Sequence, residues 1–328
     1  MSFFPGLPTE LSLTIIDLAA TPYYGGCDND PQPHVCYATA VSLAAVSTGF
    51  RAVVIPILLN TVVLRSHEDL VTFIRFIQLQ QHLKASGSRL AVDYLRVMRR
   101  FWNTESFPNF VNTASEEYLD YGLLYDVLKN MEWVGLNNST LHLLQYALDE
   151  RDVDPASDWT CRQATFWGRF WRWTPFTSNE GGLAYLRKLT HLAIWLEDQS
   201  DQPVDDPRGL HTWVKQIPFK YMPNLTHFAC SLARDDIERD GCPAYHTPNK
   251  MMVYIARPQS QGPSKHIIEQ WVSDPQDKHG VVVQYSPSPR SYPSLQSCED
   301  RTFLFWEEAC LRGDDDRAWA EASKIVAG

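Results

Sequence analysis

The chain has 328 residues, of which 44% are hydrophobic and 12% aromatic, and its formal net charge is −10. This length and composition predict a globular protein with one large domain or two ordinary ones, and they exclude a disordered chain. The acidic balance, without any long block of Lys or Arg, argues against nucleic acid and anionic membranes as partners. A protein partner is therefore the first expectation.

Two apolar segments near the N-terminus bear on the compartment. Met1 to Pro5 lacks the basic residues that precede the apolar part of a signal peptide. Val53 to Leu64 is too short to cross a membrane and is interrupted by proline and asparagine. We therefore expect neither a signal peptide nor a spanning helix, and we place the protein in the cytoplasm, the nucleus or both.

The seven cysteines are an odd number scattered along the chain, which predicts free thiols rather than a disulfide framework. Cys27, His34 and Cys36 come closest to a metal cluster, but their spacing matches no zinc motif. We expect no metal and no cofactor.

The first predicted element is a helix that follows Leu7, because Pro8 and Thr9 are typical helix openers and apolar residues follow at helical spacing up to Leu18. Further apolar helical segments are predicted over Val41–Arg51 and Val53–Leu59, with Val62–Leu64 as a short extended exit. Helices so short and so apolar could hardly form a domain alone.

This N-terminal stretch resembles an F-box. The family opens Leu-Pro-x-Glu and continues with a helix of the type Leu-x-x-Val-Ser-x-x-Phe-Arg; the matching residues are Leu7, Pro8, Glu10, Leu43, Val46, Ser47, Phe50 and Arg51. The resemblance implies docking onto a Skp-type adaptor and, through it, a cullin ubiquitin ligase. The implied adaptor-binding residues are Leu7, Pro8, Leu11, Ile15, Leu43, Val46 and Phe50.

The sequence departs from the F-box pattern at residues 21–40, which are inserted between the first and second helices. This insertion is rich in Gly, Pro and Asp, and a lengthened loop costs little closure entropy. We predict a loop there. The alternative interpretation of the whole N-terminal stretch is a helical cap on a solenoid.

The next elements are a helix over residues 67–84, which Ser66 and Asp69 open as a capping box, and a strand from Leu90 to Phe101. Three arginines at the end of that strand form a local positive spot, which is either a solvated edge or a phosphate site.

A near repeat organises the second part of the chain. Leu189-Thr190-His191-Leu192-Ala193-Ile194-Trp195-Leu196 recurs 36 positions later as Leu225-Thr226-His227-Phe228-Ala229-Cys230-Ser231-Leu232, and Leu128–Trp133 is a weaker third copy. The pattern Leu-x-x-Leu-x-Leu resembles the strand of a leucine-rich repeat, although the copies are longer and less even than usual. Helices are predicted after the strands, over residues 140–150 and 210–217.

Later segments keep the alternation without the motif. Residues 250–255 and 280–285 read as strands and 264–272 as a helix, while two amphipathic stretches, 300–311 and 314–326, are predicted to cap the array. Linkers are predicted over residues 197–207, 234–248 and 286–294. The fold class is therefore α/β: a short helical F-box over 1–64, followed by an irregular leucine-rich-repeat-like strand/helix array over 65–328. The whole chain also resembles the fungal F-box-like proteins of unassigned substrate.

No catalytic signature is found: the sequence lacks a phosphate loop, a dinucleotide fingerprint, a Gly-x-Ser-x-Gly elbow, a His-Glu-x-x-His helix and a calcium loop. His191 and His227 occupy the same place in two copies. That place alternates with the buried leucines and faces solvent, so the repeat itself accounts for it. We expect the protein not to be an enzyme.

Aromatic residues interleaved with arginines are concentrated between Trp159 and Phe176. One interpretation is core packing, with Phe166, Phe170 and Trp173 forming the inward stripe of a helix. The others are a surface for a protein partner and a site for nucleic acid or a small ligand.

The resulting hypothesis is a non-catalytic substrate receptor that offers its strand face to a protein to be ubiquitinated. The predicted substrate-binding residues are Glu132, Val134, His191, Ala193, Trp195, His227, Ala229 and Ser231. The alternative is a stand-alone interaction scaffold without a role in ubiquitination. Nothing in the residues identifies the substrate.

Overall fold

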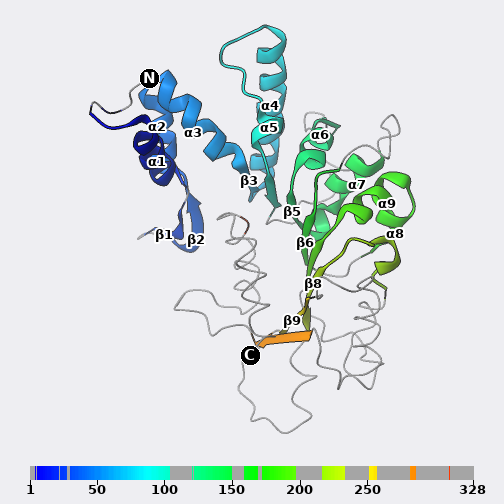
Figure 1. Cartoon of the computed structure of the whole chain (residues 1–328). Coiled ribbons are helices and arrows are strands. Elements are labelled where there is room, and N and C mark those ends of the chain that lie inside the picture. Colours follow the sequence, from blue (N-terminus) through cyan, green and yellow to red (C-terminus); the bar gives the residue numbers. More distant parts are fainter. Residues whose placement is uncertain are drawn as a thin grey trace.

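The computed structural model describes residues 4, 6–21, 23–27, 30–103, 120, 122–149, 159–168, 172–196, 216–232, 251–256, 281–285 and 310. They form an N-terminal helical unit and a mixed sheet covered by helices (Figure 1). Within these residues, no helix combines the length and the apolar character needed to span a membrane.

Three helices make up the N-terminal unit: α1 (Thr9–Ala20), α2 (Ala38–Val46) and α3 (Thr48–Asn60). Pro8 precedes α1, as predicted. The predicted segment Val41–Arg51 is divided between two helices, because Ser47 is extended and its Oγ accepts a hydrogen bond from the Phe50 N–H at 3.2 Å. Ser47 therefore ends α2 and caps α3.

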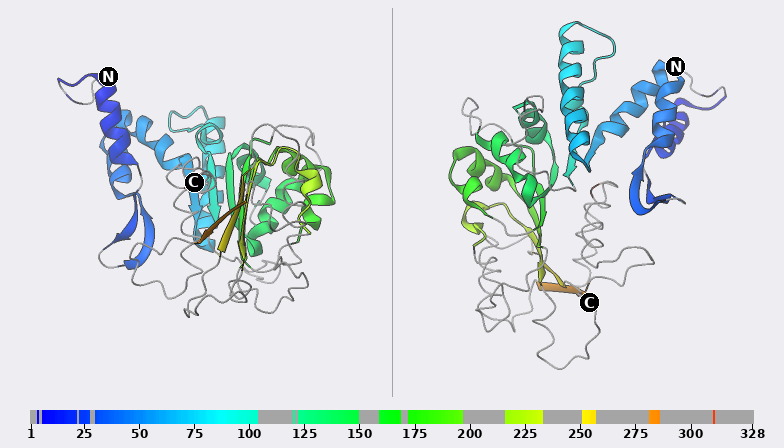
Figure 2. Two further views of the ribbon diagram at one scale, coloured as in Figure 1. Left: turned by 60° about the horizontal axis from the view of Figure 1, so that its bottom comes forward. Right: turned by 180° about the vertical axis from the view of Figure 1, so that it is seen from behind.

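The prediction of a loop over residues 21–40 was wrong, because most of the segment forms an antiparallel hairpin. Its strands are β1 (Tyr23–Cys27) and β2 (Asp30–Cys36), with a register shift between Gly25 and Cys27. The hairpin projects from the end of the helical unit that lies away from the N-terminus (Figures 1 and 2). A segment rich in Gly, Pro and Asp forms strands here because two pairing partners lie close together in sequence, which composition alone does not reveal.

An eight-stranded sheet follows, in the order β10-β9-β8-β7-β6-β5-β4-β3. Strands β3 to β8 are parallel and adjacent in sequence order, whereas β9 and β10 are antiparallel additions. The bounds are β3 (Thr61–Leu64), β4 (Arg100–Asn103), β5 (Trp133–Asn137), β6 (Gln163–Gly168), β7 (His191–Leu196), β8 (His227–Leu232), β9 (Met251–Ala256) and β10 (Val281–Tyr285). The prediction of an α/β fold is thus confirmed at the level of helices and a parallel sheet.

Helices connect the parallel strands and lie on one face of the sheet (Figures 1 and 2). They are α4 (His67–Ala85), α5 (Tyr94–Val97), α6 (Gly122–Asn130), α7 (Leu141–Asp149), α8 (Thr174–Thr177) and α9 (Glu180–Lys188), with 3₁₀ turns η2 (Asn138–Thr140) and η3 (Phe219–Tyr221). The predicted helix over 67–84 is confirmed as α4, including its capping box: Ser66 Oγ accepts from the Asp69 N–H and an Asp69 carboxylate oxygen accepts from the Ser66 N–H.

The predicted strand from Leu90 to Phe101 was wrong over most of its length. Residues 94–97 form the short helix α5, and the strand begins only at Arg100, where β4 pairs with β3. Tyr94 and Met98, four residues apart, are both buried, which is helical rather than strand spacing.

A regular backbone pattern sets the start of each strand from β5 to β8. One carbonyl of the preceding repeat accepts two consecutive N–H groups of the next, as in Thr190 and His191 to Arg162 O at 2.8 and 3.0 Å, and Thr226 and His227 to Thr190 O at 2.8 and 3.0 Å. A buried residue also lies three positions before the first strand residue that belongs to the main core; the pairs are Met98/Phe101, Met131/Val134, Cys161/Ala164, Leu189/Leu192 and Leu225/Phe228.

This pattern corrects the alignment of the third copy. The copy predicted at Leu128–Trp133 is displaced by three residues, because Leu128 belongs to α6 and Met131, Val134 and Leu136 take the places of Leu189, Leu192 and Ile194. The error arose because buried apolar residues three positions apart occur both at the end of the helix (Leu128 and Met131) and at the start of the strand (Met131 and Val134).

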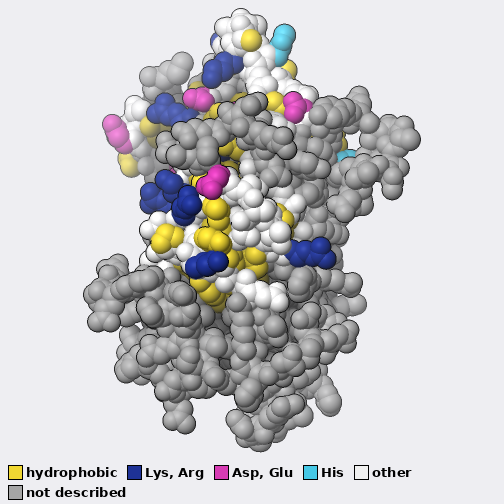
Figure 3. All heavy atoms as spheres, turned by 90° about the vertical axis from the view of Figure 1, so that its right-hand side faces the viewer, with side chains coloured by type: hydrophobic (Ala, Val, Ile, Leu, Met, Phe, Trp, Pro, Cys, Tyr) yellow, Lys and Arg dark blue, Asp and Glu magenta, His cyan; other side chains and the backbone are white. Residues whose placement is uncertain are grey.

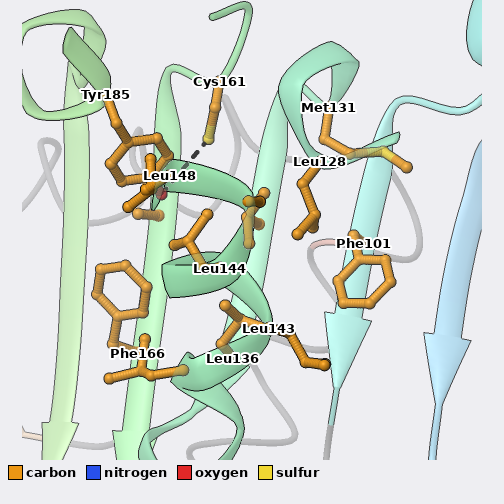
Figure 4. Packing of buried hydrophobic residues seen from close by; sticks show 14 of the residues in the cluster. Phe101, Leu128, Met131, Leu136, Leu143, Leu144, Leu148, Cys161, Phe166 and Tyr185 are labelled. Atoms are coloured by element: carbon orange, nitrogen blue, oxygen red, sulfur yellow. Dashed lines mark hydrogen bonds between the residues drawn. The ribbon is translucent and has the colours of Figure 1, made fainter. Parts of the chain in front are cut away.

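The main hydrophobic core lies between the sheet and its helices. Figure 4 shows Leu143, Leu144 and Leu148 of α7 packed over Leu136 and Phe166 of the strands. The helical unit has a separate and smaller cluster, whose fully buried members are Ile16, Ala20, Ala40 and Val54. The strands predicted over 250–255 and 280–285 are confirmed as β9 and β10. The predicted helices at 264–272 and 314–326 and the three linkers lie outside the described residues, as do residues 210–215 of the helix predicted over 210–217 and the stretch 300–311 apart from the buried Cys310.

Candidate functional site

The first candidate surface is a stripe of exposed apolar residues on and before α1. Leu7, Leu11, Ile15 and Leu18, the α1 stripe, are 41%, 53%, 45% and 72% exposed. Side chains of this kind are usually buried, and several of them together on one helix mark an interaction surface.

Helical geometry separates the α1 stripe from the face that α1 uses for packing. At about 100° per residue, Leu11, Ile15 and Leu18 fall within about 60° of one another and between about 100° and 160° from the centre of the buried face. The buried face consists of Ser12, Ile16 and Ala20. Two of its three members are small, and the α1 stripe therefore lies on a side of the helix that this packing does not use.

The predicted adaptor-binding residues divide into two groups. Leu7, Pro8, Leu11, Ile15 and Val46 are exposed, whereas Leu43 and Phe50 are half-buried and pack against the cluster of the helical unit. The Phe50 ring also meets the Phe4 ring edge-on, with centroids 6.0 Å apart. Leu43 and Phe50 therefore stabilise the unit, and the exposed group forms the accessible surface.

The second candidate surface is the sheet face opposite the helices, called here the second face. Along each strand, the residues that alternate with the core positions point to this second face, and strand pairing aligns them in rows across the sheet. The first row consists of Arg100, Trp133, Gln163, His191 and His227, and the second of Trp102, Gly135, Thr165, Ala193 and Ala229.

The centre of the second face is buried, which contradicts the prediction that the residues alternating with the core leucines face solvent. Trp102, Trp133, Thr165 and Ala193 are all buried. The Trp102 and Trp133 rings meet edge-on with centroids 6.1 Å apart, and the Trp133 indole N–H donates to Thr165 Oγ1 at 3.1 Å. A Cβ at Gly135 would lie 2.0 Å from the Trp102 ring, so this ring packs directly on the backbone of β5.

The predicted histidine pair is brought together by the pairing of β7 with β8. The His191 and His227 rings stack, with centroids 4.2 Å apart and planes at 6°. The Thr190 hydroxyl donates to Arg162 O and the Thr226 hydroxyl to Thr190 O. Each hydroxyl has one hydrogen, so each oxygen accepts from the Nδ1–H of the following histidine, at 2.8 and 2.9 Å.

The electrostatics of the pair favour neutral imidazoles. Burial and, to a lesser extent, the neighbouring His227 together lower the pKa of His191 to about 3. Burial also lowers the pKa of His227. The two rings are therefore uncharged near neutral pH. Among the described residues, no group of three His, Cys, Asp or Glu side chains is arranged to hold a metal ion.

The alignment error in the third copy also made the predicted positions of two other substrate-binding residues wrong. Val134 is fully buried in the main core, on the helix side of β5. Glu132 is exposed but precedes β5, where it lies 3.3 Å from Arg99. The side chains of Trp195, Ala229 and Ser231 lie outside the described part.

Core packing accounts for most of the aromatic residues between Trp159 and Phe176. Trp159, Phe166, Trp173 and Phe176 are buried. The predicted helical stripe was wrong, because Phe166 belongs to strand β6 and packs against the Phe176 ring at 6.0 Å. Phe170 and Trp171 lie outside the described residues.

Cys161 and Tyr185 form a buried polar contact within this core. The thiol lies 3.7 Å from the Tyr185 hydroxyl and 3.3 Å from Gln163 O (Figure 4). Burial raises the pKa of Cys161 to about 12, which keeps the thiol protonated and unreactive.

The sequence interpretation missed the exposed Leu18 of α1 and the second-face residues of β4 and β6. Leu18 had been assigned only to the apolar face of its helix. The β6 copy went unnoticed because Cys161 and Ala164 stand where the motif has leucines. Comparison of the chain with protein-family models, with curated proteins and with solved structures found no match.

Proposed function

We propose that this chain is the substrate-recognition subunit of a Skp/cullin/F-box ubiquitin ligase. In this proposal the N-terminal helical unit is an F-box that docks a Skp-type adaptor, and the strand–helix layer is an irregular leucine-rich-repeat-like array that binds a protein substrate without catalysis. The observation that carries the proposal is the α1 stripe, because it leaves four large apolar side chains exposed on and just before the helix that opens the F-box-like segment.

Three further observations support the proposal. Among the described residues, the core of the helical unit has four fully buried apolar members, so a partner that covers the α1 stripe would add to the apolar burial of this small unit. The hairpin β1–β2 projects from the end of the unit that lies away from the N-terminus (Figure 1), and Leu7 and Leu11 are exposed. The parallel strands follow one another in sequence order, with helices on one face, as in repeat arrays.

The alternative is a stand-alone scaffold whose N-terminal helices merely cap the array. In that case the apolar face of these helices should be covered by the rest of the chain. The exposure of the α1 stripe favours the receptor over the scaffold. An enzyme is the least supported class, because the paired histidines are neutral, stacked and bound to threonine hydroxyls.

The test is co-purification of the full chain with the Skp-type adaptor of the same source. We expect Leu11→Glu with Ile15→Glu to abolish adaptor retention while circular dichroism and the unfolding midpoint stay unchanged, because both positions are exposed. Leu79→Glu with Leu90→Glu is the matched control, since these two leucines are each 52% exposed and lie in and after α4. Retention of the adaptor by the α1 variant, or its loss from both variants, would overturn the proposal.

A further inference from the structure

The starts of the parallel strands carry a concentration of positive charge that the acidic chain does not lead one to expect. In the five segments that lead into β4 to β8 (96–100, 129–133, 159–163, 187–191 and 223–227), the only acidic residue is Glu132. The same segments contain Arg96, Arg99, Arg100, Lys129, Arg162, Arg187 and Lys188, called here the basic rim. The whole chain, by contrast, has 39 acidic and 29 basic residues.

Sheet topology brings the basic rim together. Parallel strands begin at the same edge, and the register aligns Arg100, Trp133, Gln163, His191 and His227 in one row. Neighbouring strands are about 4.8 Å apart, so the rim extends for about 19 Å from β4 to β8. Figure 3 shows Lys and Arg side chains recurring over the described surface on the side of α8 and α9, with acidic side chains between them.

Part of the rim is already engaged. Arg99 lies 3.3 Å from Glu132, and the Arg100 guanidinium donates to Asn60 Oδ1 at 2.9 Å. Burial raises the pKa of Tyr94, and the carboxylates of Asp126 and Asp93 raise it further, so negative charge also lies near α5.

The part next to β6 and β7 is different. Arg162 and Lys188 are exposed, and no ion pair joins either of them to another described residue. Within the described part of the chain, Arg187 pairs with Glu180 alone, at 4.0 Å. The strongest available positive charge is therefore at Arg162, Arg187 and Lys188.

Helix capping explains only some of these residues. Cations are favoured in the last turn of a helix, which accounts for Lys129 in α6 and for Arg187 and Lys188 in α9. Arg162 follows no described helix; its carbonyl starts the next strand, while its side chain extends into solvent. A purely structural role therefore leaves the clustering across repeats unexplained.

We infer that the basic rim binds an acidic, Asp- and Glu-rich segment of a protein partner in extended conformation. An extended chain advances about 3.3 Å per residue, so about six residues span the rim and alternate side chains can meet successive strands. A long nucleic acid would also meet the negative charge of the rest of the chain, whereas a short acidic segment meets mainly the rim. The centre of the second face is buried and therefore not accessible to a partner, which also favours binding at the edge of the sheet.

The identity of the bound segment as a ubiquitination substrate rests on the proposed function, but the binding itself does not. The probe is a fluorescein-labelled ten-residue peptide of alternating Glu and Ser, with alternating Gln and Ser as its neutral counterpart. Fluorescence anisotropy with the full chain should give binding of the Glu peptide alone, and this binding should weaken as salt is raised.

The decisive variants reverse charge inside and outside the rim. Arg162→Glu with Lys188→Glu should weaken binding of the Glu peptide by about tenfold or more, because two attractions become repulsions. Lys84→Glu with Arg89→Glu is the matched control: both residues are exposed, at and after the end of α4, and binding should change less than twofold.

Three outcomes would overturn the inference: no binding of the Glu peptide, equal loss in both variants, or tighter binding of a ten-nucleotide single-stranded RNA than of the peptide. Adaptor co-purification, measured on the same preparations, separates the two proposals. If the full chain retains the adaptor but does not bind the Glu peptide, only the inference about the basic rim is rejected. If it binds the Glu peptide but does not retain the adaptor, only the proposal of a ubiquitin-ligase receptor is rejected.

Discussion

Leucines are buried on α7 but exposed on α1, although both helices are short and apolar. Leu144 and Leu148 of α7 are buried between strands β5 and β6 and the helices around them, whereas Leu11 and Leu18 of α1 are exposed. The difference is one of neighbours, because each repeat of the layer supplies a strand and a helix to the next. The helical unit has no such succession, and the buried face of α1 consists of Ser12, Ile16 and Ala20. Apolar periodicity thus identifies a helix but not what covers it.

The largest expected effect is a direct test of this contrast. Leu144→Ala should lower the free energy of unfolding by about 2–5 kcal/mol, because it removes buried methyl groups and leaves a cavity in the main core. Leu18→Ala, the same change at an exposed site, should stay within about 0.5 kcal/mol. Urea unfolding of the full chain, followed by circular dichroism, measures both. Similar losses for the two variants would mean that α1 is as well covered as α7.

The histidine pair gives the next effect, on the second face of the layer. His191 has a pKa of about 3 in the folded protein and about 6.5 when unfolded, so the unfolded chain binds more protons between these values. The stability that the neutral ring contributes is therefore fully present above pH 6.5 and is lost as the pH falls below it. We expect a loss of about 1–2 kcal/mol between pH 7 and pH 5. His191→Gln should flatten this dependence, and an unchanged slope would show that the ring is accessible to protons in the folded state.

Local signals in the sequence were sufficient for the helices with explicit caps and for the repeated strands. Ser66 and Asp69 predicted the start of α4, and the two copies at Leu189 and Leu225 predicted β7 and β8. They failed where two periods overlap: Leu128 and Met131 fit both the end of a helix and a strand motif. Tyr94 was read as part of a strand, although its burial together with Met98 follows a helical turn.

The surfaces were harder to predict than the elements, because exposure depends on distant parts of the chain. The α1 stripe has the same hydrophobic pattern as a core-facing helix, and only the packing of Ser12 and Ala20 shows which side is buried. Trp102 and Trp133 stand at positions that alternate with the core, yet both are buried. The basic rim could be recognised only after the register had aligned Arg162 with the segment that contains Lys188, since β6 and α8 separate these two residues in sequence.

The smallest expected effect comes from removing one helix cap in each of the two regions. Ser66→Ala removes one side of the capping box of α4, and Ser47→Ala removes the hydroxyl that caps α3. Each substitution should cost about 1 kcal/mol, but in different units. Because α4 packs into the main core, Ser66→Ala should lower the protection of amides in β3 and β4 against hydrogen exchange. Ser47→Ala should act on α1 to α3, whose small cluster shares no fully buried residue with the main core, and should leave β5 to β8 unchanged. Equal loss of protection in β5 to β8 for the two variants would mean that the helical unit and the layer unfold as one, and the α1 stripe would then be part of a single cooperative structure.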